Sequence, residues 1–332
     1  MSIVNTFSLQ SNRQIKINFD GGDLSSDAGL LLIKEFISKL GIERLLNRSF
    51  KTNDSAVFRY HTDRDNLLQM IYMIMAGYFE DDASDELTKD PIFFNRMDED
   101  TLKQFQEISQ ILRKRIYNIQ MPQAVILDLD STLLVAYGKQ EGRAFNFHYR
   151  SNGYHPLVCY DGITGDLIKI QLCDGAAYSC TGVTDFLQPI LDEYLNDYPT
   201  IHLLLRGDSG FATPDLYKQC EENGTSYVIR LMENFIKESK SGFDFSAVSS
   251  HNRIVNANRV QVHALAYNIF NWFRRLVLSA KMRKQRIDTV RLKLLKIATK
   301  VVHSARYITF KLCSSCPYGK CFKDILNTLY SN

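Results

Sequence analysis

The chain has 332 residues, of which 45% are hydrophobic and 23% are charged. This is ordinary globular composition, and it excludes a largely disordered, fibrous or collagen-like protein. The length is about twice the ~150 residues of an average domain, so we expect two domains, or one large domain with appendages.

The start of the chain and its apolar segments argue against export and membrane insertion. The opening segment MSIVNTFSLQSNRQIK lacks the basic start and apolar run of a secretory signal. The longest apolar stretch, residues 67–79, is interrupted by Gln69 and is shorter than the ~20 residues of a membrane-spanning helix. The seven cysteines show no spaced disulfide framework. The sequence therefore predicts a cytoplasmic protein with no membrane partner.

Charge is distributed unevenly along the chain, although the formal net charge is only +3. Residues 259–324 carry 15 Lys or Arg and two acids, Asp288 and Asp324, so the rest of the chain is acidic. A basic tail of this kind favours a polyanionic partner, because each neutralised phosphate releases counterions. It indicates nucleic-acid binding, with a solvated amphipathic helix as the alternative.

The first 120 residues are predicted to be mainly helical. The segment IKINFD at 15–20 alternates as a strand does, and turn and cap residues follow it before an amphipathic run. The predicted helices span about residues 27–40, 65–78, 82–90 and 100–118.

From residue 123 the pattern changes to alternating strands and helices. The predicted strands are AVILDLDST, FNFHYR, PLVCYDG, DLIKIQLC, IHLLLRGD and YVIRL, with helices at 182–197 and 213–223. A long apolar helix at 257–278 contains Trp272, which we interpret as a core residue in preference to a base-stacking one. A basic helix from about Arg286 to Ser304 and a short strand, RYITFKL, follow.

Acids stand at two notable places in the predicted strands. Because side chains alternate across a strand, Asp128 and Asp130 in ILDLDST point to one face, and Leu127 and Leu129 point to the other. Asp208 stands where the apolar run HLLLRGD meets a glycine-flanked turn, and catalytic residues commonly emerge at the end of a buried strand. Asp130 and Asp208 are therefore candidate site residues.

A third acid, Glu233, lies in the segment ENFIKESK. Glu233, Lys237 and Lys240 are spaced i, i+4 and i+7 and share one face of a predicted helix. A cation beside an acid suits phosphate, although a surface Glu–Lys helix pair gives the same pattern. Carboxylates from separate elements can hold two divalent ions about 3.5 to 4 Å apart for phosphoryl transfer, and hard oxygen ligands favour Mg²⁺ or Mn²⁺. An acid on a first strand, one at the end of a later strand and one on a following helix is the arrangement of the ribonuclease-H-like fold.

The chain resembles a DDE-type insertion-sequence transposase of the group whose last motif reads Tyr-x2-Arg-x3-Glu-x6-Lys. The matching segments span most of residues 16–325 in the family's order. They are FDGGDLSSDAGLLLIKE, LTKDPIFFNRM, ILDLDST, FNFHYRSNGYHPLVCYDGITGDL, LLLRGDSGFA, ENFIKESKSGFDF, HALAYNIFNWFRRL and RLKLLKIATKVVHSARYITFKL. The resemblance implies that Asp130, Asp208 and Glu233 are the catalytic and metal-binding acids, and that Lys240 is the lysine of the last motif.

The same resemblance implies the activity and the partners. Two Mg²⁺ (or Mn²⁺) ions would support phosphodiester cleavage and strand transfer at the ends of a bacterial insertion sequence. The implied partners are double-stranded DNA, as terminal inverted repeats and target DNA, and a second copy of the chain on paired ends. The protein would be nucleoid-associated when bound to DNA. The residues expected to contact DNA are Lys237, Lys240, Arg274, Arg275, Arg283 and Lys284.

These patterns together predict an α/β (α+β) fold with a ribonuclease-H-like mixed sheet. We expect a mainly helical, DNA-binding region at 1–120, a catalytic domain at 121–278 and a basic, mainly helical region at 279–332.

Two departures from the family pattern concern the third acid. In relatives a long, mostly β insertion separates the second acid from the third, whereas Asp208 and Glu233 are 25 positions apart here. Tyr227 and Arg230 give Tyr-x2-Arg-x2-Glu, one residue short of the family motif. An internal deletion joining YVIRLM to ENFIKES would explain both facts. The alternative function is then a non-catalytic, DNA-binding remnant of a transposase.

The strand ILDLDSTL also fits the Asp-x-Asp-x-Thr motif of phosphatases that resemble the haloacid dehalogenase superfamily. Asp128 would then be the nucleophile and Asp130 the general acid. The later lysine and the closely spaced acidic pair of that family are lacking, which makes this the weaker interpretation.

Two other signals remain open. Cys313, Cys316 and Cys321 have the opening spacing of a zinc site, but there is one CxxC pair only, which favours reduced cysteines. His148 and His155 follow the first acid on the hairpin strands, where a catalytic role and a hydrogen bond to a loop carbonyl are both reasonable.

Overall fold

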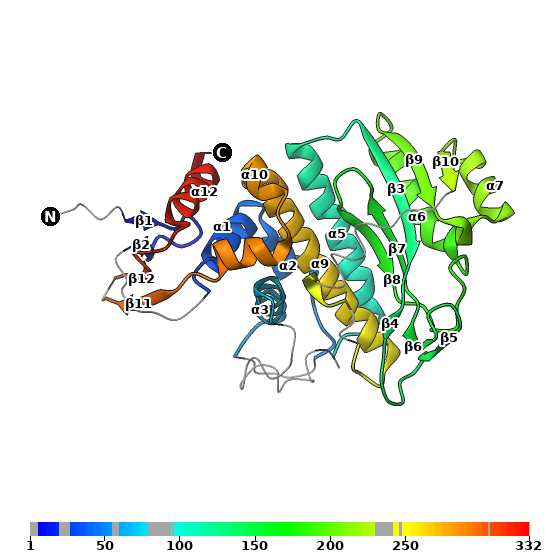
Figure 1. The fold of residues 1–332 in the computed structure, drawn as a ribbon, viewed down its shortest axis with the longest axis horizontal. Coiled ribbons are helices and arrows are strands. Elements are labelled where there is room, and N and C mark those ends of the chain that lie inside the picture. The colour runs from blue at the N-terminus through cyan, green and yellow to red at the C-terminus, as the bar shows by residue number, and fades with distance from the viewer. Residues whose placement is uncertain are drawn as a thin grey trace. The chain divides into compact units, whose positions relative to one another are not determined.

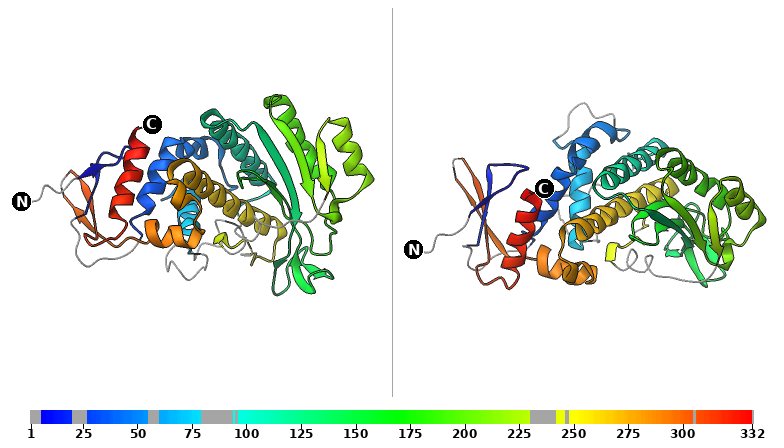
Figure 2. Two further views of the ribbon diagram at one scale, coloured as in Figure 1. Left: turned by 45° about the horizontal axis from the view of Figure 1, so that its top comes forward. Right: turned by 90° about the horizontal axis from the view of Figure 1, so that it is seen from above.

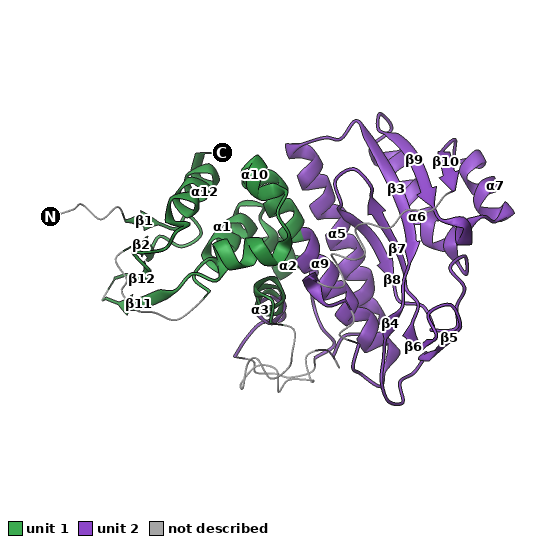
Figure 3. Cartoon of the chain, in the orientation of Figure 1, with its two compact units in different colours: residues 1–48, 68–78, 269–332 green, residues 49–67, 79–268 purple. Residues whose placement is uncertain are grey.

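The computed structural model describes residues 6–19, 27–54, 60–78, 94, 96–229, 242–245, 248–304 and 306–331. The chain forms two compact units, shown in Figure 3. Unit 1 comprises residues 1–48, 68–78 and 269–332, and unit 2 comprises residues 49–67 and 79–268. Among the helices of the described residues, none is long and apolar enough to cross a membrane.

Unit 2 is built around a five-stranded mixed sheet with the order β10-β9-β3-β7-β8 (Figure 1). Its strands are β3 (Ala124–Ser131), β7 (Leu157–Asp161), β8 (Leu167–Gln171), β9 (His202–Gly207) and β10 (Ser226–Ile229). The hairpin-linked strands β3, β7 and β8 are antiparallel neighbours, whereas β9 runs parallel to β3 and β10 runs parallel to β9. This topology confirms the predicted α/β class and the ribonuclease-H-like mixed sheet.

Helices lie on both sides of this sheet. Figures 1 and 2 show α5 and the first half of α9 on one side, and α6 with α7 on the other. The bounds are α5 (Glu99–Ile119), α6 (Val183–Asp197), α7 (Pro214–Glu222) and α9 (Arg253–Val277). Helix α5 begins at a capping box, in which the Asp98 side chain accepts the backbone N–H of Thr101 and the Thr101 hydroxyl accepts the N–H of Asp98.

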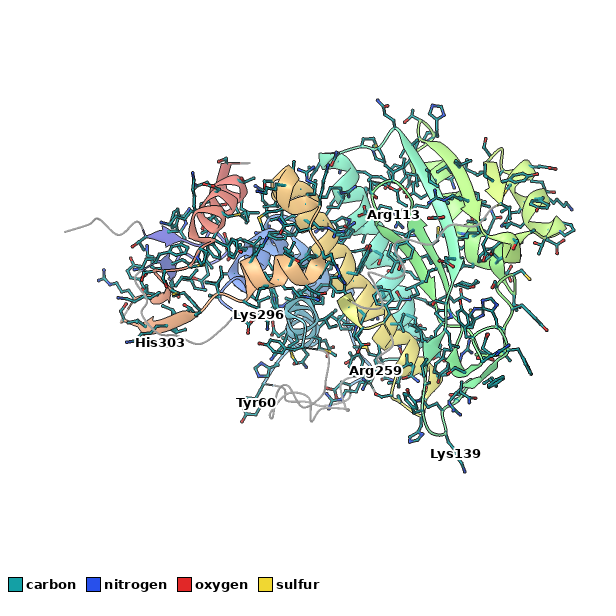
Figure 4. All side chains as sticks on the ribbon, viewed as in Figure 1. Tyr60, Arg113, Lys139, Arg259, Lys296 and His303 are labelled. Atoms are coloured by element: carbon teal, nitrogen blue, oxygen red, sulfur yellow. The ribbon has the colours of Figure 1, made fainter. Side chains whose placement is uncertain are left out.

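A buried ion pair fixes α5 to the sheet and to α6. The Arg113 guanidinium on α5 donates to both carboxylate oxygens of Glu193 on α6 at 2.7 Å and to the backbone carbonyl of Ile168 on β8 at 3.3 Å (Figure 4). Both charged side chains are less than a tenth exposed. Because a buried charge needs a partner and hydrogen bonds, this pair specifies how the two helices meet the sheet.

A small three-stranded sheet, of order β4-β6-β5, lies between β3 and β7 in the chain. It consists of β4 (Leu134–Val135), β5 (Ala144–Asn146) and β6 (Ser151–Tyr154). The segment FNFHYR, predicted as one strand, is therefore a strand end followed by the turn that connects β5 to β6. The Asn146 side chain accepts the N–H groups of His148 and Tyr149, which closes a turn that alternation alone does not reveal.

Unit 1 joins both ends of the described chain in one sheet of order β1-β2-β12-β11. Its strands are β1 (Phe7–Ser8), β2 (Ile15–Asn18), β11 (Thr299–His303) and β12 (Ile308–Leu312), and β2 runs parallel to β12. The helices wholly or mainly in this unit are α1 (Leu30–Lys39), α2 (Ile42–Ser49), α3 (Asp63–Ala76), α10 (Ala280–Arg283), α11 (Ile287–Val290), the π-helical turn η3 (Arg291–Leu295) and α12 (Gly319–Ser331). The units thus group the chain differently from the three predicted regions, because β2 and β12 are distant in sequence but pair directly.

The predicted basic helix from about Arg286 to Ser304 is wrong. Within this segment, helical structure ends with η3. Residues 299–303 form β11, which pairs with β12. The β-branched residues of TKVVH favour a strand once a partner strand is present. Lys296 marks the change, since its ammonium lies 2.9 Å from Asp27 Oδ1 and 3.7 Å from the centroid of the Tyr78 ring, all within unit 1 (Figure 4).

Trp272 is 2% exposed, so the interpretation of this side chain as a core residue is confirmed. The predicted helix at 82–90 and the predicted helix over ENFIKESK both lie outside the described residues.

Candidate active site

Asp130 and Asp208 lie near the ends of two adjacent parallel strands. The register of β3 with β9 ends with the pair Asp128 and Arg206, and each candidate acid follows its member of that pair by two residues, Asp130 within β3 and Asp208 directly after β9. The ion pair between Asp128 and Arg206 shows that these side chains share one face, and alternation places Asp130 and Asp208 on that face too. Neighbouring strands are about 4.8 Å apart, so the two acids are close neighbours at the end of the sheet.

The burial of β3 explains why Asp130 points out of the core. Leu127 and Leu129 are at most 4% exposed, whereas Asp128 and Asp130 on the opposite face are half-buried. The prediction that the two kinds of side chain alternate is confirmed. The Ser131 backbone N–H donates to Asp130 Oδ1 at 2.7 Å, which orients this carboxylate at the strand end.

A tight turn after β9 holds Asp208. Asp208 is extended, with φ −80° and ψ 178°, and its Oδ1 accepts the Gly210 N–H at 2.8 Å, which caps the 3-10 turn η2 (Ser209–Phe211). Phe211 is fully buried and anchors this turn. A Cβ on Gly207 would meet the Phe211 ring at 3.2 Å, and a Cβ on Gly210 would meet Asp208 Oδ1 at 3.0 Å. Both glycines therefore permit the close packing that aims the carboxylate.

Asp128 forms an ion pair with Arg206 on the adjacent strand β9. Arg206 donates from Nε to Asp128 Oδ1 at 2.8 Å and from Nη2 to Asp128 Oδ2 at 2.5 Å. The hydrogen bond to Asp128 also raises the pKa of Arg206. The sequence analysis did not identify Arg206 as the partner of Asp128. The spacing gave a signal, because Asp128 precedes Asp130 by two residues and Arg206 precedes Asp208 by two residues.

Hydroxyl and imidazole groups surround the end of β3. The Ser131 hydroxyl hydrogen-bonds with the Ser179 hydroxyl at 2.8 Å, and the Tyr149 hydroxyl donates to the Ser131 carbonyl at 3.3 Å. His155 Nδ1 lies 2.7 Å from the Ala177 carbonyl, and burial lowers the pKa of this imidazole. His155 thus makes the loop-carbonyl hydrogen bond that the sequence left open. Ser179 and Tyr149 come from distant loops, and no sequence pattern pointed to them.

The donor chemistry at this strand end fits a hard divalent cation in part. Asp130 and Asp208 both lie near this strand end, and within the described part of the chain Asp208 forms no ion pair. No cluster of three or more His, Cys, Asp or Glu side chains with metal-binding geometry occurs among the described residues. Glu233, Lys237 and Lys240 lie outside those residues, so their predicted roles remain predictions.

The predicted DNA-contacting residues of the C-terminal region lie on consecutive elements of unit 1. Arg274 and Arg275 occupy the last turn of α9 and are half-buried, and Arg274 donates to the Asn271 side chain at 2.9 Å. Arg283 and Lys284 are exposed at the end of α10. Their contact with DNA remains a prediction.

The cysteines near the C-terminus make sulfur contacts that do not resemble a metal centre. Cys313 Sγ lies 3.1 Å from the Ser315 hydroxyl, and the Cys321 thiol donates to Met282 Sδ at 3.1 Å. All seven cysteines, including Cys316, are free thiols.

The protein family described as "Transposase DDE domain group 1" matches this chain over residues 7–99, 93–234 and 231–331. The chain belongs to this family. The resemblance on which the sequence analysis rested is thereby confirmed. Two of the acids named by that resemblance, Asp130 and Asp208, lie near the ends of the adjacent strands β3 and β9.

Solved structures with similarity to this transposase chain are also transposases. The piggyBac transposase in a synaptic complex with hairpin DNA is 12% identical, with 80% of each chain covered and a TM-score of 0.39. The catalytic domain of Mos1 mariner transposase is 10% identical, with 57% of this chain and 97% of that chain covered and a TM-score of 0.26. These similarities are distant. The comparison with curated proteins found no match.

Proposed function

We propose that this chain is a transposase that cleaves phosphodiesters at the ends of a bacterial insertion sequence and transfers the freed strand into target DNA. The observation that supports the proposal is that β3 and β9 are adjacent parallel strands and that Asp130 and Asp208 each lie two residues beyond their last register pair, Asp128 and Arg206. Double-stranded DNA with terminal inverted repeats is the proposed substrate. A homodimer on paired ends and a cytoplasmic, nucleoid-associated location belong to the same proposal.

In this proposal Asp130, Asp208 and Glu233 hold two Mg²⁺ or Mn²⁺ ions. When bound, such ions activate the attacking oxygen and stabilise the leaving oxygen. The chain's own groups prepare the site. The N–H groups of Ser131 and Gly210 orient the two carboxylates, and the half-buried position leaves the carboxylates accessible to DNA. Lys237 and Lys240 are proposed to contact phosphate.

The arrangement of Asp128 disfavours the phosphatase alternative. A carboxylate nucleophile needs an accessible oxygen, and both oxygens of Asp128 accept hydrogen bonds from Arg206. In the proposed transposase site the ion pair has a different use, because Arg206 removes one negative charge beside Asp130. The three acids of the proposed site can then hold cations without a fourth uncompensated negative charge beside them.

A second candidate function is a non-catalytic, DNA-binding remnant. One stretch of the family match ends at residue 234 and the next begins at 231, where the sequence analysis places the missing insertion. The family match is also divided at residues 93–99, so a division alone does not indicate a deletion. The division at 231–234 supports the remnant because it coincides with the short spacing from Asp208 to Glu233.

The test uses the full chain and DNA carrying the inverted repeats that flank its gene. The transposase proposal expects nicking in Mg²⁺ or Mn²⁺ and none in EDTA. Asp130→Asn and Asp208→Asn should each abolish nicking while DNA binding persists, and Asp128→Asn serves as the matched control. Binding without nicking by the unaltered chain would support the remnant. Hydrolysis of small phosphate esters that depends on Asp128 would support the phosphatase.

A further inference from the structure

The turn between β5 and β6 presents four consecutive exposed side chains: Phe147, His148, Tyr149 and Arg150. We call these four residues the aromatic turn. Phe147 is 87% exposed and Tyr149 is 39% exposed. Large aromatic side chains rarely gather on a surface unless a partner covers them. The stretch 142–155 contains two Arg, two His and no acid, so this segment of the chain carries a net positive charge.

Hydrogen bonds hold the aromatic turn in one shape. Asn146 is 6% exposed, and its Oδ1 accepts the N–H groups of His148 and Tyr149 at 3.1 and 3.2 Å. Its Nδ2 donates to the Gly175 carbonyl at 3.0 Å. Arg150 adopts a positive φ of 51°, which is uncommon for a residue with a side chain and is held here by the turn. The exposed rings are therefore preorganised, and a ligand that binds them pays little ordering entropy.

The aromatic turn is tied to the candidate active site. The Tyr149 hydroxyl donates to the carbonyl of Ser131, the residue that follows Asp130. A second exposed ring comes from another loop: Tyr178 is 81% exposed and precedes Ser179, whose hydroxyl bonds to the Ser131 hydroxyl. Aromatic side chains from two loops thus flank the strand end that carries the first acid.

Neighbouring aromatic rings pack against the exposed rings of the aromatic turn. Phe147 packs edge-to-face on Phe145, with ring centroids 5.2 Å apart, and the His148 ring meets Tyr149 in the same manner at 4.7 Å. Edge-to-face packing leaves a flat ring face open to a further partner. A row of supported rings with arginine and histidine between them suits nucleobases, because every base has a face that stacks and a phosphate that a cation attracts.

We propose that the aromatic turn, together with Tyr178, stacks on unpaired DNA bases next to the phosphate handled at Asp130 and Asp208. The inference rests on the proposed function for its location, because a cut strand end supplies unpaired bases there. Charge and continuity with the acid pair favour DNA as the occupant. A second copy of this chain would also bury aromatic rings, and the experiment separates the two.

The experiment measures binding of the full chain to a 20-nucleotide mixed-sequence single strand and to the blunt duplex of the same sequence, both in EDTA. Stacking contributes about fivefold to about 160-fold in affinity per base, so Phe147→Ala and Phe147→Leu should each weaken single-strand binding by at least about fivefold. Duplex binding should change less than about twofold. Phe147→Trp should retain binding, and its indole emission should be quenched by the single strand, whereas the buried Trp272 contributes a constant background.

Tyr60→Ala is the matched control, since Tyr60 is a 92% exposed aromatic residue that projects elsewhere in unit 2 (Figure 4). It should leave single-strand binding unchanged. Equal binding by Phe147→Ala and the unaltered chain, or no single-strand binding at all, overturns the inference. Loss of a dimer in light scattering on Phe147→Ala, with DNA binding intact, overturns it in favour of a second copy.

The two proposals fail separately. Because the binding assay contains no metal, an inactive chain whose single-strand binding depends on Phe147 refutes the nuclease and retains the stacking surface. Metal-dependent nicking, together with single-strand binding that does not depend on Phe147, supports the nuclease and refutes the stacking surface. Phe147 is almost fully exposed, so its truncation should leave the stability of the fold unchanged, and an unchanged melting temperature confirms an intact fold.

Discussion

Replacing Asp208 by Asn should stabilise the metal-free protein. Asn keeps the oxygen that accepts the Gly210 N–H, so the turn after β9 survives the change. What is lost is the repulsion between the carboxylates of Asp208 and Asp130, which lie near the ends of neighbouring strands about 4.8 Å apart. Two unit charges at about 5 Å repel by about 0.8 kcal/mol at the dielectric of water and about 3 kcal/mol at an effective dielectric of 20. Because both acids are half-buried, we expect a gain of about 1 kcal/mol.

The assay is thermal unfolding of the full chain in EDTA and across a titration of Mg²⁺ or Mn²⁺. A gain of about 1 kcal/mol raises the melting temperature of a unit of this size by about 2 to 4 °C. For the unaltered chain, a cation at a hundred times its dissociation constant should add about 2.7 kcal/mol. Asp208→Asn should lose most of that rise, so the two proteins should exchange their order of stability as metal is added.

Asp128→Asn is the matched control, because it lies on the same face of β3 but breaks the ion pair with Arg206. It should lower the melting temperature in EDTA, by about 1 kcal/mol in stability, and leave the metal-dependent rise intact. The reasoning fails if Asp208→Asn destabilises the metal-free chain as Asp128→Asn does. It also fails if the metal-dependent rise survives in Asp208→Asn.

Three further predictions concern the stability of each unit. Arg113→Met leaves Glu193 buried without its partner, so we expect a loss of about 3 to 5 kcal/mol in denaturant titrations, largely recovered when Glu193→Leu is added. Burial lowers the pKa of His263, so the unfolded chain binds a proton first and the free energy of unfolding falls as the pH drops below about 6.5. His263→Asn should flatten that slope, and an unchanged slope would contradict the assignment. Gly29→Ala would place a Cβ onto the backbone carbonyl of Leu294 within unit 1, and should cost about 1 to 3 kcal/mol, seen as a lower melting temperature and faster proteolysis.

Local patterns in the sequence were sufficient for the strands of the mixed sheet and for the strand positions of Asp130 and Asp208. The alternation in AVILDLDST predicted β3 and the face of Asp130, and the apolar run before Asp208 predicted a strand end. Both depend on neighbours along the chain, since the period of a strand is visible in one segment. The order of motifs then indicated the family, which the match over most of the chain confirmed.

The sequence failed where a residue's structure depends on a distant partner. Residues 299–303 were predicted as helix and form β11, because the partner strand β12 itself pairs with β2 from the other end of the chain. The turn at 147–150 was predicted as strand, because its closure by Asn146 is a side-chain hydrogen bond without a periodic signal.

The sequence by itself determined that Asp130 lies on a strand and that Asp208 follows the end of one, because alternation and apolar runs are local. Only the tertiary structure decided that β3 and β9 are adjacent, which brings Asp130 and Asp208 to the same end of the sheet, and that Asp128 is paired with Arg206. The register between parallel strands is set by the packing of the core and by the long connection between them, and neither leaves a pattern in either strand alone.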